Sequence, residues 1–161
     1  MKIMMIFARS TAAAVLVGVA SIAIIVGGNS GCPTFLDSVN LSGGREVPPN
    51  TSTGSGSGRY ELSVGGSELR FVITAEGLSG PVTEAHFHVV SPNAVADPVV
   101  LDLAPFLTEV DGQVAVAGAS SLTEWSIGNA LEEILAHQIY VNLHTETYPD
   151  GEIRGWVMVS P

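Results

Sequence analysis

The stretch YVNLHTETYPDGEIRG, residues 140–155, decides how this chain folds. From Ile139 to Thr145 apolar and polar residues alternate, which is typical of a β-strand with one buried face. The polar residues of this segment are Tyr140, Asn142 and His144. Because side chains at every second position of a strand share a face, we expect this phenol, amide and imidazole to lie in one row.

A tight turn follows this strand. Residues 148–151, Tyr-Pro-Asp-Gly, have proline second and glycine fourth, as a type I turn prefers. The chain then returns, which brings Glu152 and Arg154 back beside the first strand on a polar face shared with Trp156. We expect Arg154 to pair with an acidic neighbour, because the chain has many more acidic than basic residues. Asn142, beside it, is expected to be a buried hydrogen-bonding residue.

Turn-forming residues recur about every ten residues after Thr34, which is typical of an all-β protein. Further strands are expected at residues 35–41, 59–64, 69–75, 82–90, 99–103 and 113–117. With the two strands of the opening stretch they make about eight, which predicts an antiparallel β-sandwich or barrel of the Greek-key type.

One short helix is expected among the strands. Asn129 is its predicted N-cap, and Glu132 completes a capping box. The apolar face of this helix is Leu131, Ile134 and Leu135. The helix ends near His137, which is expected to be a capping or surface group. Residues 51–58 are a Gly, Ser and Thr run, which is typical of a flexible surface loop.

The charge of the chain excludes one class of partner. The chain has 161 residues, enough for one domain of ordinary size. After Arg9 it contains four arginines and no lysine against sixteen acidic residues, a formal charge of −12. Such a chain repels phosphate backbones, so nucleic-acid binding is not expected.

The N-terminal residues 1–31 have the layout of an export signal. A basic start, an apolar run at 12–26 and a small polar segment follow one another. Cys32, the only cysteine, stands where the cleavage box of a bacterial lipoprotein would have its acylated residue. Lipidation at Cys32, ordinary signal cleavage and an uncleaved anchor all remain open. We expect a protein of the cell envelope or a secreted one, which contacts the membrane only through its N-terminus.

Several motifs resemble the CHRD (chordin-type) domain family, found in animal chordins and in many exported bacterial proteins. They are LSGGREVPP at 41–49, AHFH at 85–88, and YVNLHT at 140–145 with GEIRG at 151–155. The resemblance covers about Val39 to Val159. It implies a single all-β extracellular domain over residues 33–161, and it identifies Tyr140, Asn142, Glu152 and Arg154 as framework residues. The resemblance identifies the type of domain, but it implies no particular reaction.

Three histidines are candidate metal ligands. His86 and His88 lie two apart on a predicted strand and therefore point the same way. His144 can be a third ligand if its strand is a neighbour, and three imidazoles with an open position suit copper or zinc. Glu84 or Glu152 would then be the outer partner that fixes a ring tautomer. The alternative is that the three are hydrogen-bonded surface groups on a polar face.

The sequence contains no catalytic constellation that we can identify. There is no Gly-x-Ser-x-Gly elbow, and no spacing selects two of the many carboxylates as a catalytic pair. We therefore expect a non-enzymatic binding or interaction module, whose ligand is an unknown protein or extracellular molecule. The alternative function is a copper- or zinc-binding domain, which would then have a redox-related role.

Overall fold

The structure, a computed structural model, describes residues 17–18, 21–22, 38–92 and 96–159. The chain divides into two units, Met1–Gly31 and Cys32–Pro161. In the first unit the strands β1 (Val17–Gly18) and β2 (Ser21–Ile22) form an antiparallel pair. Cys32 and most of the predicted export signal lie outside the described residues. Among the residues that are described, no helix is long and apolar enough to cross a membrane.

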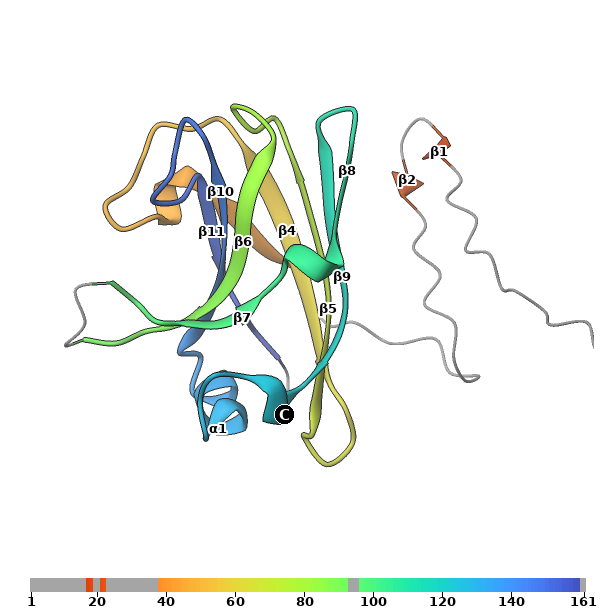
Figure 1. Ribbon diagram of the computed structural model, residues 1–161, viewed down its shortest axis with the longest axis vertical. Coiled ribbons are helices and arrows are strands. Elements are labelled where there is room, and N and C mark those ends of the chain that lie inside the picture. Colours follow the sequence, from red (N-terminus) through yellow and green to blue (C-terminus); the bar gives the residue numbers. More distant parts are fainter. Residues whose placement is uncertain (1–16, 19–20, 23–37, 93–95, 160–161) are drawn as a thin grey trace, which may run out of the picture. The chain divides into compact units, whose positions relative to one another are not determined.

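The second unit is built on one antiparallel sheet of nine strands in the order β7-β6-β10-β11-β3-β4-β5-β9-β8. Figure 1 shows this sheet curled into a half-barrel. Its strands are β3 (Val39–Ser42), β4 (Ser55–Leu62), β5 (Glu68–Glu76), β6 (Val82–Val89), β7 (Val99–Asp102), β8 (Leu107–Val110), β9 (Gln113–Ser121), β10 (Ile139–Thr145) and β11 (Ile153–Trp156). The short helices are η1 (Gly43–Arg45), η2 (Ala104–Phe106), η3 (Leu122–Glu124) and α1 (Ala130–Leu135). The predicted all-β antiparallel fold with one short α-helix is confirmed.

The sheet order places two distant strands side by side. Strand β10 lies between β11, its partner in the predicted hairpin, and β6, more than 50 residues earlier in the chain. The turn of the hairpin is present, because the amide of Gly151 donates to the carbonyl of Tyr148 at 3.1 Å. All seven residues of β10 are buried. Both faces of this strand are therefore covered, although only one faces the apolar core.

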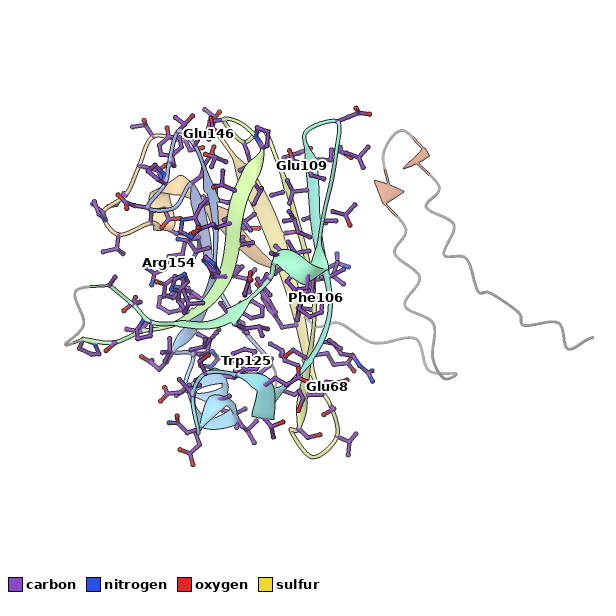
Figure 2. All side chains as sticks on the ribbon, in the orientation of Figure 1. Glu68, Phe106, Glu109, Trp125, Glu146 and Arg154 are labelled. Atoms are coloured by element: carbon purple, nitrogen blue, oxygen red, sulfur yellow. The ribbon has the colours of Figure 1, made fainter. Side chains whose placement is uncertain are left out.

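The core fills the inside of the curl. Alternate residues are buried and apolar along β5, along β6 from Ala85 and along β10 up to Leu143, as expected of a strand that faces a core. The aromatic ring of Phe71 contacts Phe87 and Phe106 edge-on, at centroid distances of 5.3 and 5.1 Å. In Figure 2 Phe106 lies on the side of β5 and β9, while Arg154 lies on the side of β10 and β11. Since Ile139, Val141 and Leu143 of β10 face this core, the polar residues of β10 lie on the outer face of the half-barrel.

Two segments differ from the sequence-based expectation. Residues 55–58 belong to β4, where a flexible loop was expected, and pair with residues 73–76 of β5. Glycine is needed here, since a Cβ at Gly56 would lie 2.7 Å from the carbonyl oxygen of Thr74. The close approach of neighbouring strands, not flexibility, therefore explains the glycines. The edge strand β8 was not predicted, since Leu107–Val110 is too short to show a clear alternation.

The helix α1 lies where it was expected but is held differently. Asn129 is its N-cap residue, yet its side chain does not cap the backbone and instead donates to the carboxylate of Glu133 at 2.8 Å. The predicted capping box with Glu132 is therefore wrong. The helix buries Ala130 and Ile134. Leu135, predicted on the apolar face, is 46% exposed, because consecutive helix residues point about 100° apart and Ile134 is the one that faces the core.

Candidate metal centre

The register between β6 and β10 brings three histidines to one place. His88 lies opposite Tyr140, and His86 lies opposite Asn142. His144 is two residues further along β10 on the same face. The odd-numbered neighbours on both strands point into the core. The same alternation that buries the apolar residues therefore gathers the imidazoles on the outer face.

The three rings are close together. Their centroids are 5.4 Å apart for His86 and His144, 5.6 Å for His86 and His88, and 6.4 Å for His88 and His144. One ring nitrogen from each residue lies within 4.8 Å of the other two. The expectation that the three histidines converge is met by the geometry. Whether they bind an ion is a separate matter.

Each histidine of the cluster has a buried nitrogen with no hydrogen-bond partner among the described residues. These atoms are Nδ1 of His86, Nε2 of His88 and Nε2 of His144. A buried polar atom without a partner costs free energy, on the order of 1–3 kcal/mol each. Three such atoms in one cluster are the arrangement that a bound ion would satisfy.

Backbone carbonyls set the tautomers of two rings. Nδ1 of His88 lies 2.9 Å from the carbonyl oxygen of Asp97, and Nδ1 of His144 lies 2.9 Å from that of Pro149. A carbonyl can only accept, so each Nδ1 carries the hydrogen and each Nε2 keeps a lone pair. The prediction that Glu84 or Glu152 fixes a tautomer is wrong, because loop carbonyls take this role.

The surroundings of His88 and His144 lower the pKa of both imidazoles and so favour their neutral form. Burial lowers the pKa of His88, and the neighbouring rings of His86 and His144 lower it further, against the hydrogen bond to Asp97. Burial also lowers the pKa of His144, with His86 acting in the same direction and the hydrogen bond to Pro149 opposing. Metal ions bind the neutral imidazole, so both shifts favour a ligand state at neutral pH.

Tyr140 and Arg154 pack beside His88. The phenol ring stacks on the His88 imidazole with a centroid distance of 5.0 Å and an angle of 7° between the planes. The guanidinium carbon of Arg154 lies 3.4 Å from the centre of the Tyr140 ring. Arg154 also forms the expected acidic pair, at 4.0 Å from Asp97. Tyr140 is only 5% exposed, so its ring is a fixed surface against which His88 is oriented.

Asn142 is buried as expected, and its partner was not anticipated. Its amide nitrogen donates to both carboxylate oxygens of Glu46, at 3.1 and 3.0 Å. Burial raises the pKa of Glu46 to about 7, although Arg154 and the Asn142 amide act in the other direction. Glu46 belongs to the LSGGREVPP motif, so the signal was present in the sequence, but no spacing rule links residue 46 to residue 142.

Glu152 does not lie on the face of the histidines. Its carboxylate accepts hydrogen bonds from the hydroxyls of Ser52, Ser79 and Thr145 and from the amide of Ser79, at 2.6–2.8 Å. Burial alone would raise the pKa of Glu152, but these hydrogen bonds outweigh it and lower the pKa. The expectation that Glu152 shares the polar face with Arg154 is therefore wrong. Its ionised carboxylate links Thr145 of β10 to Ser52 and Ser79, which lie in two loops.

The cluster fits a small ion after slight closure. Imidazole nitrogens bind zinc at about 2.0–2.1 Å, so two nitrogens of one tetrahedral site lie about 3.4 Å apart. The present spacing, within 4.8 Å, exceeds this by at most about 1.4 Å. Small rotations of the side chains about their χ angles can supply that movement. The donor set, three imidazoles and no carboxylate, suits copper or zinc better than magnesium or calcium.

The chain was compared with known proteins at three levels. The family model of the CHRD domain matches residues 38–157. A search of curated proteins and a search of solved structures found no match. The matched region includes all nine strands of the sheet and the three histidines. It also holds each motif on which the resemblance was based. The chain is therefore a member of the CHRD domain family.

Proposed function

We propose that this CHRD domain is an extracytoplasmic binding module whose ligand is a copper or zinc ion held by His86, His88 and His144. The observation that supports this proposal is the convergence on one sheet face of three imidazoles, each of which has a buried nitrogen without a hydrogen-bond partner among the described residues. The proposed role is binding. Three protein ligands leave a fourth position open to water or to a group from a partner.

The charges near the cluster favour a cation. Glu84 and Asp150 act on His144, and Asp97 acts on His88, each in the direction expected of a nearby negative charge. The one nearby arginine, Arg154, is engaged with Asp97 and Tyr140. A local excess of carboxylates raises the concentration of cations at the site and weakens anion binding.

The proposed location is the cell envelope or the exterior. It is supported by the export-signal layout of residues 1–31 and by Cys32 directly after it. Mass spectrometry of the membrane-extracted protein is expected to show an acylated Cys32 if the domain is lipid-anchored. A mature N-terminus downstream of residue 32, without a lipid, would contradict the anchor.

Metal analysis of the purified protein tests the binding proposal. After incubation with Zn(II) or Cu(II) and removal of the excess, the wild type is expected to retain about one ion per chain, because three ligands form one site. The double variant His86→Ala, His88→Ala is expected to retain none, because one imidazole does not hold an ion.

A fourth histidine supplies the control for this experiment. His137 lies outside the cluster and is exposed. The variant His137→Asn is expected to retain the Zn(II) ion, which excludes a general effect of removing an imidazole. Circular dichroism of the double variant should show the β-sheet spectrum of the wild type. A wild type that retains neither ion would remove the proposal.

A further inference from the structure

The histidine outside the cluster contacts the only methionine of the folded domain. His137 Nδ1 lies 2.9 Å from Sδ of Met158. The chain has four histidines and four methionines, and the other three methionines are within the first five residues. Met158 is 41% exposed, and His137 is also exposed. A thioether and an imidazole thus meet at the surface.

The pair lies next to two strands of the site: His137 is two residues before β10, and Met158 is two residues after β11. Burial alternates at the end of the chain: Val157 is fully buried, Met158 is 41% exposed, and Val159 is 8% exposed. Met158 therefore continues the outward row of Arg154 and Trp156. His137 follows helix α1 and lies three residues before Tyr140, which pairs with His88.

Two aromatic rings pack in a row beside the cluster. Trp156, the outward residue before Met158, contacts Tyr140 edge-on at 6.0 Å. Tyr140 in turn stacks on His88 at 5.0 Å. The row of rings thus runs from His88 on β6 through Tyr140 on β10 to Trp156 on β11, which is two residues before Met158.

We propose that His137 and Met158 form a second metal site, specific for copper(I). A thioether is a soft ligand that prefers Cu(I) and binds Zn(II) poorly, whereas an imidazole accepts either. Two metal ligands at the surface make a weak site with open coordination positions, which suits an ion that is transferred to another protein. The inference rests on the proposed function and deepens it, because it identifies copper as the metal that the domain binds.

The geometry allows the pair to open around an ion. With metal–nitrogen and metal–sulfur bonds of about 2.0 and 2.3 Å, the two donors of a trigonal site lie about 3.7 Å apart. The present contact of 2.9 Å must therefore widen by about 0.8 Å. Both side chains are exposed, and methionine has three rotatable bonds, so this movement meets little resistance. The backbone of His137, with φ of 57°, need not change.

The test is a Cu(I) titration under ascorbate and without oxygen, against a chromophoric chelator. The parent chain and every variant of it carry Cys32→Ser, Met4→Leu and Met5→Leu, so that neither a thiol nor a group of N-terminal thioethers competes. The parent is expected to bind two Cu(I) ions, and both Met158→Leu and His137→Asn are expected to bind one. Leucine keeps the volume of methionine without sulfur, and asparagine tolerates the positive φ of residue 137 without an imidazole. X-ray absorption of the parent should show one more sulfur ligand than Met158→Leu.

A second background separates this inference from the three-histidine proposal. In the parent chain with His86→Ala and His88→Ala added, the pair alone is expected to bind one Cu(I), and adding Met158→Leu should abolish it. Binding in this background supports the pair even if the cluster binds nothing. If either Met158→Leu or His137→Asn leaves the Cu(I) stoichiometry unchanged in both backgrounds, the pair is only an N–H···S contact and the inference is overturned.

Discussion

Two buried carboxyl groups of this domain are held in opposite states. Glu46 is 6% exposed and its pKa is raised to about 7, because burial outweighs the donors around it. Glu152 is fully buried, yet its pKa is lowered because four hydrogen bonds outweigh the effect of burial. Burial therefore does not decide the charge of a carboxyl group by itself. The number of hydrogen-bond donors around the carboxyl group decides whether it is ionised.

The raised pKa of Glu46 predicts a loss of stability with rising pH. The unfolded chain releases this proton near pH 4.5 and the folded chain near pH 7, so the stabilisation is complete below 4.5 and is lost as pH rises through 7. The variant Glu46→Gln cannot ionise. Relative to the wild type, its free energy of unfolding is expected to increase by up to about 3 kcal/mol between pH 4.5 and 8. Urea unfolding at both pH values measures this, and parallel profiles would contradict it.

Glu152→Gln is the matched control, with the opposite sign. The lowered pKa of Glu152 gives stability that is present above pH 4.5 and is lost as pH falls. The variant should therefore be most destabilised at neutral pH, by about 2 kcal/mol, as for hydrogen bonds to a charged group. The difference from the wild type should shrink towards pH 3.

Tyr140 is predicted to orient His88 for metal binding. Its ring stacks on the imidazole, and Arg154 packs against the same ring. Tyr140→Leu removes this flat surface and is expected to weaken Zn(II) or Cu(II) binding by about 10- to 100-fold, as for other outer partners of ligands. Tyr140→Phe keeps the ring and should bind within about twofold of the wild type, which a chelator competition measures. Equal affinity of the leucine variant would show that stacking plays no part.

At the scale of the element, strand β4 shows how a glycine-rich run forms regular structure. Gly56 lies opposite Ala75 of β5, where a Cβ would meet the Thr74 carbonyl oxygen at 2.7 Å. The Cβ of a residue at 58 would meet the buried ring of Tyr60. Gly56 therefore allows β4 to approach β5 closely, and Gly58 leaves room for the Tyr60 ring of its own strand, at the entropic cost that glycine brings to a strand.

Gly56→Ala is expected to destabilise the domain by about 1–3 kcal/mol, because the added methyl group has a backbone oxygen in its way. Gly80→Ala is the control, since a Cβ at Gly80 meets nothing within 4 Å. Thermal or urea unfolding of both variants measures the difference. If the two variants were equally stable, close packing would not explain the glycine at 56.

The sequence predicted the elements whose residues carry a local pattern. Alternation identified β5, β6 and β10, and the Tyr-Pro-Asp-Gly turn identified the hairpin. The sequence also identified the three histidines as a group, because side chains at alternate positions of a strand lie on the same face of the sheet. The carbonyls that orient His88 and His144 were not predictable, since they belong to loops at Asp97 and Pro149. Neither was the contact of Glu46 with Asn142, which depends on pairing across 96 residues.

At the scale of the whole molecule, metal binding should stabilise the fold. The ligands lie on strands β6 and β10, which adjoin only in the folded sheet, so the unfolded chain offers no comparable site. At an ion concentration 100 times the Kd, the stabilisation is about 2.7 kcal/mol. For a domain of this size that corresponds to a rise in Tm of about 10 °C.

Differential scanning fluorimetry with Zn(II) measures this shift. The double variant His86→Ala, His88→Ala should show none, and Mg(II) should not shift the wild type, because magnesium prefers oxygen ligands. A shift of equal size in the variant would place the stabilising ion elsewhere on the acidic surface.

The division of β6 and β10 into two faces has an evolutionary consequence. The residues that alternate with the histidines, such as Phe87 and Leu143, are fully buried in the core. Substitutions at 86, 88 or 144 leave that core intact, so descendants of this sequence can lose, exchange or acquire ligands while inheriting the same scaffold. A shift of one position along either strand would instead disturb both faces at once. On β6 and β10, point substitutions can therefore change the ligands of the outer face without loss of the fold, whereas an insertion would destabilise the core.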